Sequence, residues 1–450
     1  MNTPLYTRIL DYYKQNRISF AMPGHKNGRG LANELINCDV TELTYTENLH
    51  HPRQFVKESK QLLSKLFKSD ESFIITGGST AGIQAMITAS LKPGQTLLAA
   101  SDCHMSVINT CALLGINLRF IPKEINSEYL IPTKLKNISE YIHGVDAVII
   151  TSPTYYGLCA DVKSLAEVCH MNNIPLLVDE AHGAHFTASK KFPEPAIISG
   201  ADAVCQSAHK TLNALTGAAF LHIKSKLINY NRLKKALYMF QTSSPSYVIA
   251  ASADTARAEL EQGGWDEMCE LCEEFRKRLA ENTEIKILDN DDCTRLVLCF
   301  KEYDITGFEI EEMLAESYQT DVEMADLLNV VLIVTPSNTA SDMEKLYLSL
   351  VSITASLKKR SKAIEIDLPP AFDGVISPHD AFFSDTKMLP LERSCGKISA
   401  VTVTSYPPGI PIIYIGAKIT AEQVDYIKYL EKKGAEITGI NEGCIEVVYD

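Results

Sequence analysis

Short runs of β-branched and other apolar residues alternate with helical stretches between residues 70 and 225, and this alternation constrains the fold most. Six runs have the pattern of strands: Phe73–Thr76, Thr96–Ala100, Asp146–Thr151, Leu176–Asp179, Asp202–Gln206 and Gly217–His222. Helical stretches lie between several of them, at Ala81–Leu91, His104–Leu114 and Ser164–Met171. Strand and helix in turn predict an α/β fold, with a mainly parallel sheet and helices on both of its faces. We therefore expect functional side chains at the strand ends and in the loops that follow them.

The sequence pattern changes along the chain and predicts four regions. Their bounds are a helical segment at 1–20, a large domain at 21–240, a small α/β domain at 241–365 and a C-terminal domain at 366–450. In the small domain, residues 286–300 and 328–335 have the pattern of strands, and residues 309–317 between them have the pattern of a helix.

Composition limits the classes of function. Apolar residues make up 46% of the chain, and the formal net charge is −13. This acidic balance argues against a nucleic-acid partner, and it suits a cationic substrate as well as simple solubility. The first residues, MNTPLYTRILDYYKQ, lack the apolar region of a signal peptide, and no apolar run approaches the ~18–20 residues of a membrane helix. We therefore expect a cytoplasmic protein with no membrane partner.

Twelve cysteines are spread along the chain without a framework of short spacings, which predicts reduced thiols. Cys269 and Cys272 form a CxxC pair, but this pair lies inside a predicted helix and has no second pair at zinc spacing. We expect no metal site.

The strongest local feature is the segment SAHKT (207–211), which directly follows a predicted buried strand. A buried ammonium is costly, so a lysine at this place is unusual. Schiff-base chemistry is the commonest reason to keep one there, because burial lowers the pKa of the lysine and frees its amine. Taken alone, Lys210 is explained more simply as a solvent-facing lysine just past a strand.

A second feature lies 31 positions earlier, where an apolar strand ends in Asp179. Pyridoxal 5′-phosphate (PLP) needs a carboxylate against its pyridine nitrogen, so that the protonated ring can accept the electron pair left on Cα. Asp179 is placed for this role. A strand-end aspartate that caps the next helix is the ordinary alternative, and the pairing with Lys210 weakens that alternative.

Two helix starts complete the pattern. The junction TGGSTAG (76–82) supplies small residues at Gly78 and hydroxyl groups at Ser79 and Thr80, and the start of the following helix would hold a phosphate. His104 begins the next helix, where its ring could stack on the face of a pyridine. An ordinary helix cap and a polar histidine at a helix start explain these features equally well when each is taken alone.

These segments, in this order, resemble the fold-type-I PLP enzymes and, more narrowly, the Orn/Lys/Arg decarboxylase family. The resemblance rests on AMPGHK (21–26), LHHP (49–52), GGSTAGIQA (77–85), SPTYYG (152–157), VDEAHGAHF (178–186), SAHKT (207–211), QTSSPSY (241–247) and YPPGIP (406–411). AMPGHK and YPPGIP are the most specific motifs, because generic aminotransferases are not expected to contain them. The resemblance implies a large domain with a mostly parallel seven-stranded sheet, smaller α/β C-terminal domains, and the short form without an N-terminal receiver-like domain.

The resemblance also implies roles at matching positions. Lys210 would bind PLP as a Schiff base, Asp179 would pair with the pyridinium, and His104 would stack on the ring. His182 would line the cofactor. His209 would lie near the substrate carboxylate or return a proton to Cα.

The phosphate of PLP would bind to Ser79, Thr80 and Ser207, with Gly78 in the same turn. The family builds its active site across a homodimer interface, which implies that Thr242–Ser246 reaches the phosphate of a neighbouring subunit.

The implied reaction is PLP-dependent decarboxylation of lysine, arginine or ornithine. In the family, YPPGIP is usually followed by a segment that contains an acid, whereas this chain has Ala417 there. This departure leaves the substrate preference open, and it also leaves open a family member that binds PLP or only self-associates and has lost turnover. A different PLP reaction on the same fold, such as transamination or β-elimination, is a separate alternative. Glu323 matches an acidic motif of the family and could face the distal cation of the substrate, although a solvated surface acid also fits.

Overall fold

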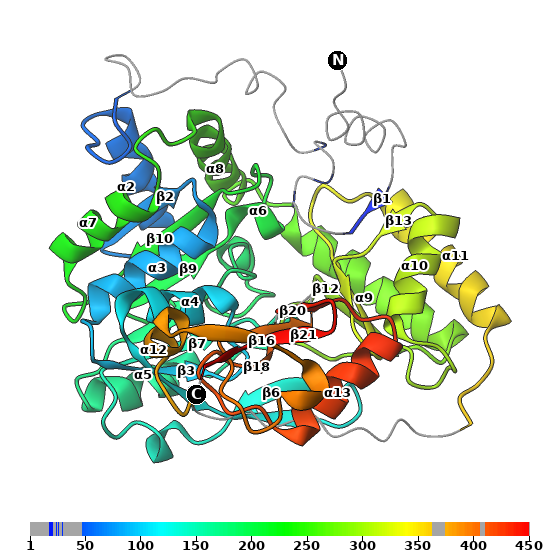
Figure 1. Cartoon of the computed structure of the whole chain (residues 1–450). Helices are drawn as coiled ribbons and strands as arrows, with labels where there is room; N and C mark the ends of the chain where they lie inside the picture. Colours follow the sequence, from blue (N-terminus) through cyan, green and yellow to red (C-terminus); the bar gives the residue numbers. More distant parts are fainter. Residues whose placement is uncertain are drawn as a thin grey trace, which may run out of the picture.

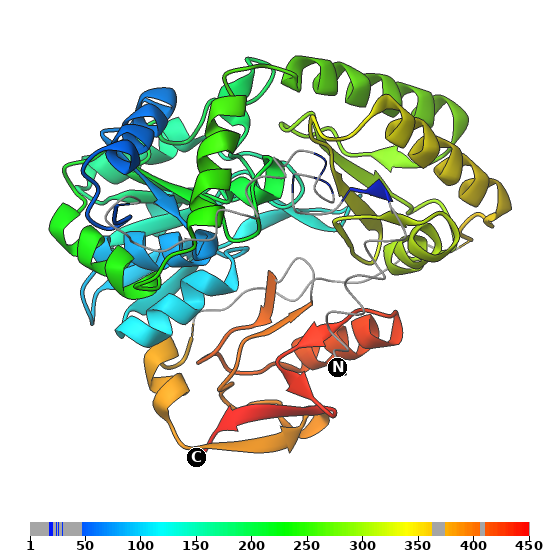
Figure 2. The same ribbon diagram turned by 90° about the horizontal axis from the view of Figure 1, so that it is seen from above.

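Three lobes make up the chain in a computed structural model that describes residues 18–20, 24, 26, 29, 47–361, 374–405 and 410–449. The first lobe is built around a seven-stranded sheet, the second around a four-stranded sheet and the third around two three-stranded sheets, and Figure 2 shows the three lobes side by side (Figures 1 and 2). The largest lobe carries the sheet that the sequence pattern predicts.

The large sheet has seven strands in the order β2-β10-β9-β8-β7-β3-β4. Their bounds are β2 (Glu71–Ile75), β3 (Thr96–Ala100), β4 (Asn117–Ile121), β7 (Ala147–Thr151), β8 (Leu176–Asp179), β9 (Ala203–Gln206) and β10 (Ala219–Ile223). β10 runs antiparallel to both of its neighbours, and the other pairs are parallel. The predicted α/β class with a mostly parallel seven-stranded sheet is therefore confirmed.

The sequence pattern did not predict strand β4. β4 lies at the edge of the sheet, where the exposed Asn117 and the half-buried Arg119 alternate with buried apolar residues. Because an edge strand buries only part of its surface, it lacks the continuous apolar run that marks the central strands. The adjacent hairpin of β5 (Lys123–Asn126) and β6 (Ile131–Leu135) was missed for the same reason.

Helices cover both faces of this sheet. On one face lie α3 (Gly78–Ser90), α4 (Met105–Leu114) and α7 (Tyr230–Phe240), which share a buried apolar cluster with the sheet. On the other face lie α2 (Phe55–Phe67), α5 (Val162–Met171) and α8 (Tyr247–Glu259), with a second cluster. Helices on both faces are the arrangement that the strand–helix alternation predicts.

The small domain has a four-stranded sheet in the order β11-β12-β15-β14. Its elements are α9 (Trp265–Asn282), β11 (Lys286–Ile287), β12 (Arg295–Cys299), α10 (Gly307–Ser317), β13 (Thr320–Asp321), β14 (Met324–Ala325), β15 (Asn329–Ile333) and α11 (Ala340–Ser356). The short strand β1 (Ile18–Ser19) pairs in parallel with β13, so the start of the described chain joins this domain. The helix expected before it lies outside the described residues.

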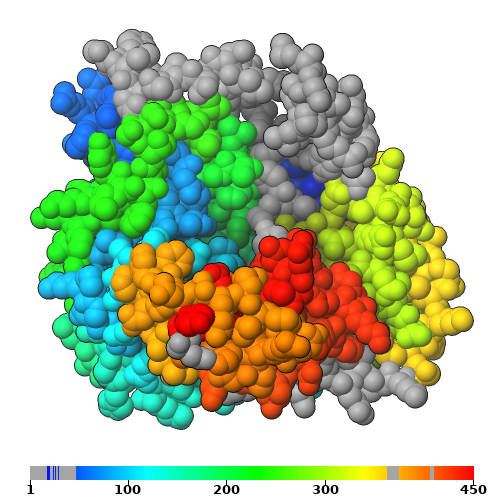
Figure 3. Space-filling model, in the orientation of Figure 1, coloured from blue at the N-terminus to red at the C-terminus, as the bar shows by residue number. Residues whose placement is uncertain are grey.

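The C-terminal lobe holds two three-stranded sheets and two helices. Its elements are α12 (Pro378–Phe383), β16 (Thr386–Pro390), β17 (Val403–Ser405), β18 (Ile410–Ile413), α13 (Ala421–Lys432), β19 (Ile437–Thr438), β20 (Ile440–Asn441) and β21 (Cys444–Val448). The ring of His379 in α12 lies 2.7 Å from the carbonyl oxygen of Ala112 in α4, measured from Nδ1. Figure 3 shows this lobe, in orange and red, lying against the large domain. The exact domain boundaries stay predictions.

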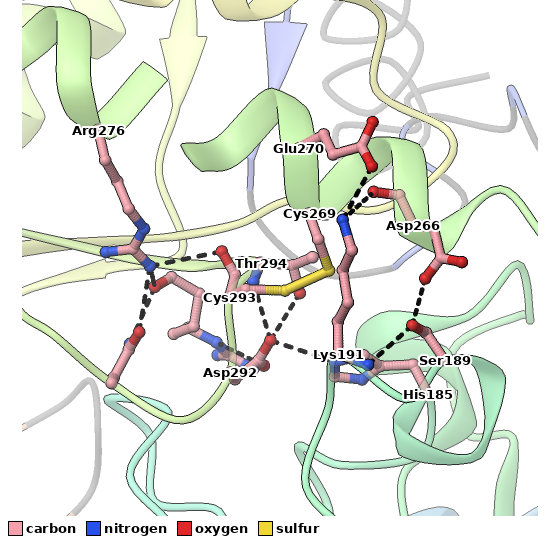
Figure 4. Close-up of a disulfide and its surroundings, with 12 residues drawn as sticks. His185, Ser189, Lys191, Asp266, Cys269, Glu270, Arg276, Asp292, Cys293 and Thr294 are labelled. Atoms are coloured by element: carbon pink, nitrogen blue, oxygen red, sulfur yellow. Dashed lines mark hydrogen bonds and ion pairs between the residues drawn. A yellow bond between two sulfur atoms is a disulfide. The ribbon is translucent and has the colours of Figure 1, made fainter. Parts of the chain in front are cut away.

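One pair of cysteines departs from the expectation of reduced thiols. Cys269 in α9 is joined to Cys293 by a disulfide, with 5.5 Å between their Cα atoms (Figure 4). Cys272 is buried and free, so the CxxC motif is not itself a disulfide. The two partners are 24 residues apart, and their closeness arises from the fold of the small domain rather than from a short sequence spacing. Among the residues with a described structure, no helix is long and apolar enough to cross a membrane.

Candidate active site

A cavity lies where β7, β8 and β9 end, at the sheet edge expected for function. Its lining consists of Ser79, Asp102, His104, Pro132, Thr151, Thr154, Tyr155, Tyr156, Asp179, Ala181, His182, Lys210 and Ile410. Lys210 and Asp179 therefore face one common space, although they come from different strands. This convergence is the geometric condition on which the sequence interpretation depends.

Lys210 belongs to α6 (Ala208–Thr211), a single turn that follows β9. Its Nζ lies 3.0 Å from Nε2 of His182 and 5.6 Å from the centre of the Tyr155 ring. Desolvation lowers the pKa of Lys210 below its ordinary value, and the carboxylates of Asp179 and Glu323 act in the opposite direction. The amine is therefore more available in its neutral form than an ordinary lysine would be.

Asp179 is the last residue of β8 and is almost fully buried, with 4% of its surface exposed. Its Oδ1 accepts a hydrogen bond of 3.1 Å from the backbone N–H of Ala181. Desolvation raises the pKa of Asp179, whereas His104 and Lys210 nearby act to lower it. The carboxylate is thus a buried acceptor that a cation or a protonated ring nitrogen would stabilise.

The two helix starts also reach the cavity. His104 is the N-cap of α4, and its Nδ1 accepts a hydrogen bond of 3.1 Å from the backbone N–H of Ser106. Ser79 lies in the first turn of α3, directly after Gly78. Gly78 has a φ of +74° and no atom within 4 Å of the place where a Cβ would stand, so the approach to this helix start is open.

Four predicted residues lie outside the cavity lining: Gly78, Thr80, Ser207 and His209. Thr80 is exposed on α3. Ser207 is fully buried, and its Oγ lies 3.3 Å from Nδ1 of His209. The same nitrogen of His209 lies 3.1 Å from the carbonyl oxygen of Ala218, so this ring is held against β10 rather than in the cavity.

The small domain supplies residues that the sequence analysis did not find. Arg295, at the start of β12, is fully buried and places its Nη1 3.3 Å from Nδ1 of His182. Glu323 was a weak candidate, and its Oε1 accepts a hydrogen bond of 2.6 Å from the hydroxyl of Tyr155. No local pattern marks Arg295, because an arginine that opens a strand is ordinary until tertiary contacts are known.

Comparison with known proteins assigns the chain to a family. Residues 3–336 match the family described as Orn/Lys/Arg decarboxylase, major domain, and residues 370–444 match its C-terminal domain. The chain belongs to the Orn/Lys/Arg decarboxylase family. The family predicted from the motifs is therefore confirmed.

Relatives and solved structures agree with this assignment. The chain is 30% identical to an arginine decarboxylase of Bacillus anthracis, over 99% of this chain and 96% of that protein. It is 29% identical to an arginine decarboxylase of Bacillus subtilis, over 99% and 97%. A crystal structure of a Francisella novicida lysine decarboxylase has a TM-score of 0.78 at 20% identity, covering 99% of this chain and 81% of that one. At this identity the structural likeness concerns the fold.

Gly24, from the motif AMPGHK of this decarboxylase-family chain, lies beside the Lys210 segment. The backbone N–H of Gly24 donates a hydrogen bond of 2.6 Å to the carbonyl oxygen of His209. A Cβ at Gly24 would stand 2.3 Å from the carbonyl oxygen of Leu212, so only glycine allows this close approach. Lys26 in the same motif is buried, and desolvation lowers its pKa to about 7.

Ala417, which stands where the family usually has an acid, packs in an apolar core. Ala417 is 1% exposed and belongs to the apolar cluster that includes Tyr414 and Ile415. Its side chain does not line the cavity that holds Lys210. The absence of an acid at this position therefore removes no group from the cavity.

Proposed function

We propose that this protein is a PLP-dependent decarboxylase that acts on a basic amino acid. The convergence of Lys210 and Asp179 on one cavity carries the proposal. Membership of the Orn/Lys/Arg decarboxylase family supports it, because decarboxylation of these amino acids is the reaction after which the family is named. The roles of the individual residues are part of the same proposal.

The residues of the cavity fit PLP. Lys210 offers an amine whose pKa is lowered by desolvation, which suits covalent attachment of an aldehyde. Asp179 offers a buried carboxylate that would pair with the pyridine nitrogen. The start of α3 at Gly78 and Ser79 is open. The N–H of Gly78 already donates a hydrogen bond of 2.8 Å to the carbonyl oxygen of Gly217, so the phosphate would bind to the N–H groups of the first turn from Ser79 onward.

When bound, PLP supplies an electron sink for the pair left on Cα as carbon dioxide departs. Asp179 would hold a proton at the ring nitrogen, and His104 would position the ring by stacking on it. The apolar side chains of Pro132, Ala181 and Ile410 limit water around the substrate carboxylate and so favour loss of its charge. Lys210 is better placed than His209 to return a proton to Cα, because Lys210 lines the cavity and His209 does not.

Glu323 is the proposed partner of the distal cation of the substrate. Its hydrogen bond from Tyr155 holds it next to a residue that lines the cavity. Arginine is the first substrate to test, because the two relatives reported above are arginine decarboxylases at about 30% identity. Lysine and ornithine share the same distal charge and belong in the same panel.

We further propose a homodimer in the cytoplasm, with Thr242–Ser246 facing the second copy. This segment joins α7 to α8, and residues 242–244 are exposed. The carbonyl oxygen of Thr242 lies 3.3 Å from Nε2 of His50 in the LHHP motif, so two family motifs share this surface. Light scattering of the purified protein tests the dimer, and a monomeric mass would contradict it.

The test of function is a substrate panel on purified, PLP-loaded protein. We expect carbon dioxide and the matching amine from arginine, lysine or ornithine. We also expect Lys210→Ala to abolish turnover and the visible absorbance of bound cofactor. Lys224→Ala is a matched control, since Lys224 is an exposed lysine directly after strand β10 of the same sheet. A keto acid formed without carbon dioxide, or full turnover in Lys210→Ala, would contradict the proposal.

A further inference from the structure

Arg295 is a buried cation to which the proposed reaction assigns no role. Its side chain is fully buried, and its Nε lies 3.9 Å from Oδ2 of Asp292. Its Nε and Nη2 have no hydrogen-bond partner in the described part of the chain. A buried guanidinium is costly unless it is well paired. At 3.9 Å, the ion pair with Asp292 is too long to offset the full cost of burying this guanidinium.

The remaining guanidinium nitrogen points to the cavity. Nη1 lies 3.3 Å from Nδ1 of His182 and 3.4 Å from the carbonyl oxygen of Tyr155. A guanidinium can only donate hydrogen bonds, so Nδ1 of His182 must accept. Desolvation holds the pKa of His182 well below its usual range, and the ring is neutral. Its single N–H must then be at Nε2.

The protonated nitrogen faces the amine of Lys210. Nε2 of His182 lies 3.0 Å from Nζ of Lys210. If Nε2 carries the hydrogen, the amine must accept it through a lone pair, and an ammonium has no lone pair. The opposite tautomer would place a lone pair at Nε2 and would favour the ammonium. The tautomer of His182 therefore decides which form of Lys210 is stabilised.

We infer that Arg295 is a positioning residue that fixes His182 as the Nε2–H tautomer and thereby holds the amine of Lys210 in its neutral, nucleophilic form. The inference deepens the proposed function and rests on it, because it needs Lys210 as the point of cofactor attachment. Attachment joins Nζ of Lys210 to the aldehyde carbon of PLP with loss of one water, and it requires the lone pair of the nitrogen.

Other ionisable groups around Lys210 favour its ammonium form, so a neutral amine needs an opposing interaction. Asp179 from β8, Glu323 from the small domain and Cys205 from β9 raise the pKa of the amine, while desolvation and Arg295 lower it. His104 at the start of α4 is coupled to the same charges through Asp179 and Lys210. Two carboxylates thus favour the ammonium, and the donor chain from Arg295 through His182 opposes them.

His209 provides an internal comparison. Its Nδ1 lies 3.1 Å from the carbonyl oxygen of Ala218, which can only accept a hydrogen bond. Nδ1 of His209 therefore carries the hydrogen, which is the opposite arrangement to His182. The two histidines should differ in a measurement that reports which ring nitrogen is protonated.

The first measurement is ¹⁵N NMR of the cofactor-free protein with labelled histidine. The His182 signals are identified by their loss in His182→Gln. We expect His182 to be protonated at Nε2 and not at Nδ1, and His209 to carry a hydrogen on Nδ1. A hydrogen on Nδ1 of His182 in the unmodified protein overturns the inference, and this result does not depend on whether any Arg295 variant folds.

The second measurement is the rate at which the cofactor-free protein captures PLP, followed by absorbance across pH. We expect Arg295→Met to raise the pH at which the capture rate is half-maximal by about one unit. Capture of PLP would then be roughly tenfold slower at neutral pH. The rates should converge at high pH, where the amine is neutral in both proteins.

Arg276→Met is the matched control. Arg276 is a half-buried arginine of α9 whose Nη2 donates a hydrogen bond of 2.8 Å to the carbonyl oxygen of Arg295, and Figure 4 shows it reaching toward the loop of Asp292 and Thr294. Its loss should loosen the same loop without changing the partner of His182. An unshifted profile in Arg295→Met, or an equal shift in Arg276→Met, overturns the inference. Failure of the proposed function would appear differently, as PLP capture that persists in Lys210→Ala.

Discussion

The wall of the cavity and the layer behind it are built in different ways. The wall comes mainly from the large domain, which presents Asp179 at the end of β8 and Lys210 just after β9 of the same sheet. Behind this wall, the small domain presents Arg295, which does not line the cavity but contacts His182 across 113 residues of sequence. The proposed reactive groups come from neighbouring strand ends, whereas the group proposed to set the protonation of Lys210 comes from another domain. Changes in the wall should therefore affect chemistry, and changes in the small-domain layer should affect stability and protonation.

The largest effect is expected for Asp179→Asn. The amide cannot hold a proton at the pyridine nitrogen as a carboxylate does, so we expect a loss of about 10³-fold in kcat, or about 4 kcal/mol. Circular dichroism should show an unchanged fold, because the amide is nearly isosteric and can still accept from the N–H of Ala181. A variant with more than a tenth of the original kcat would remove Asp179 from its proposed role.

Asp292→Ala should act on stability. Asp292 is buried in the small domain, where its Oδ1 lies 3.3 Å from Nε2 of His185 and accepts hydrogen bonds from Thr294 (Figure 4). Desolvation acts to raise the pKa of Asp292, but His185 and Arg295 hold it below its ordinary value. Removing the carboxylate leaves Arg295 without its nearest anion, so we expect a loss of about 3 kcal/mol in the free energy of unfolding.

The neighbouring acid is the control for this prediction. Asp291 is exposed, and its Oδ2 accepts a hydrogen bond from the backbone N–H of Cys159. Asp291→Ala should cost less than about 1 kcal/mol, as is usual for a single exposed hydrogen bond. Denaturant unfolding measures both variants, and equal losses would show that burial of the charge is not the cause.

Glu180 tests pH dependence on the large-domain side. Desolvation raises the pKa of Glu180 to about 8. Among the residues that the structure describes, no cation beside Glu180 offsets its burial as Arg295 does for Asp292. A raised pKa in the folded state means that stability is full below about pH 4.5 and is lost as the pH rises toward 8. We therefore expect the Tm of the unmodified protein to fall by a few degrees across this window relative to Glu180→Gln. Any constant cost of the substitution cancels in this comparison. Parallel Tm curves would contradict the assignment.

The smallest effect is expected where the C-terminal lobe contacts the large-domain wall. The hydroxyl of Tyr414 donates a hydrogen bond of 2.5 Å to the carbonyl oxygen of Ser101, three residues before His104. Tyr414→Phe should lower the free energy of unfolding by about 1 kcal/mol. Tyr426→Phe is the control, since the hydroxyl of Tyr426 has no partner among the residues with described positions. A loss in Tyr426→Phe as large as that in Tyr414→Phe would show that the bond to Ser101 is not responsible.

The central part of the fold could be read from the sequence. Buried parallel strands are continuous apolar runs, and the six predicted strands coincide with β2, β3, β7, β8, β9 and β10. β4 was missed because an edge strand alternates polar and apolar residues. Among the site residues, Ser79, His104, Asp179, His182 and Lys210 reach the cavity because each lies at or within a few residues of the end of a predicted element. Gly78, Thr80, Ser207 and His209 do not line it, since neighbours in sequence can point to opposite sides of a turn.

The sequence by itself placed the two candidate reactive groups at successive strand ends, with an acid at the end of one strand and a lysine after the next. It also identified the family. These features are local, because hydrophobic periodicity and turn residues act over a few positions. The tertiary structure alone decided that Arg295 meets His182, that Cys269 meets Cys293, and that Ala417 lies in a core. Such contacts join residues tens to hundreds of positions apart, and the pKa values of the cavity depend on them because charge and burial act through space rather than along the chain.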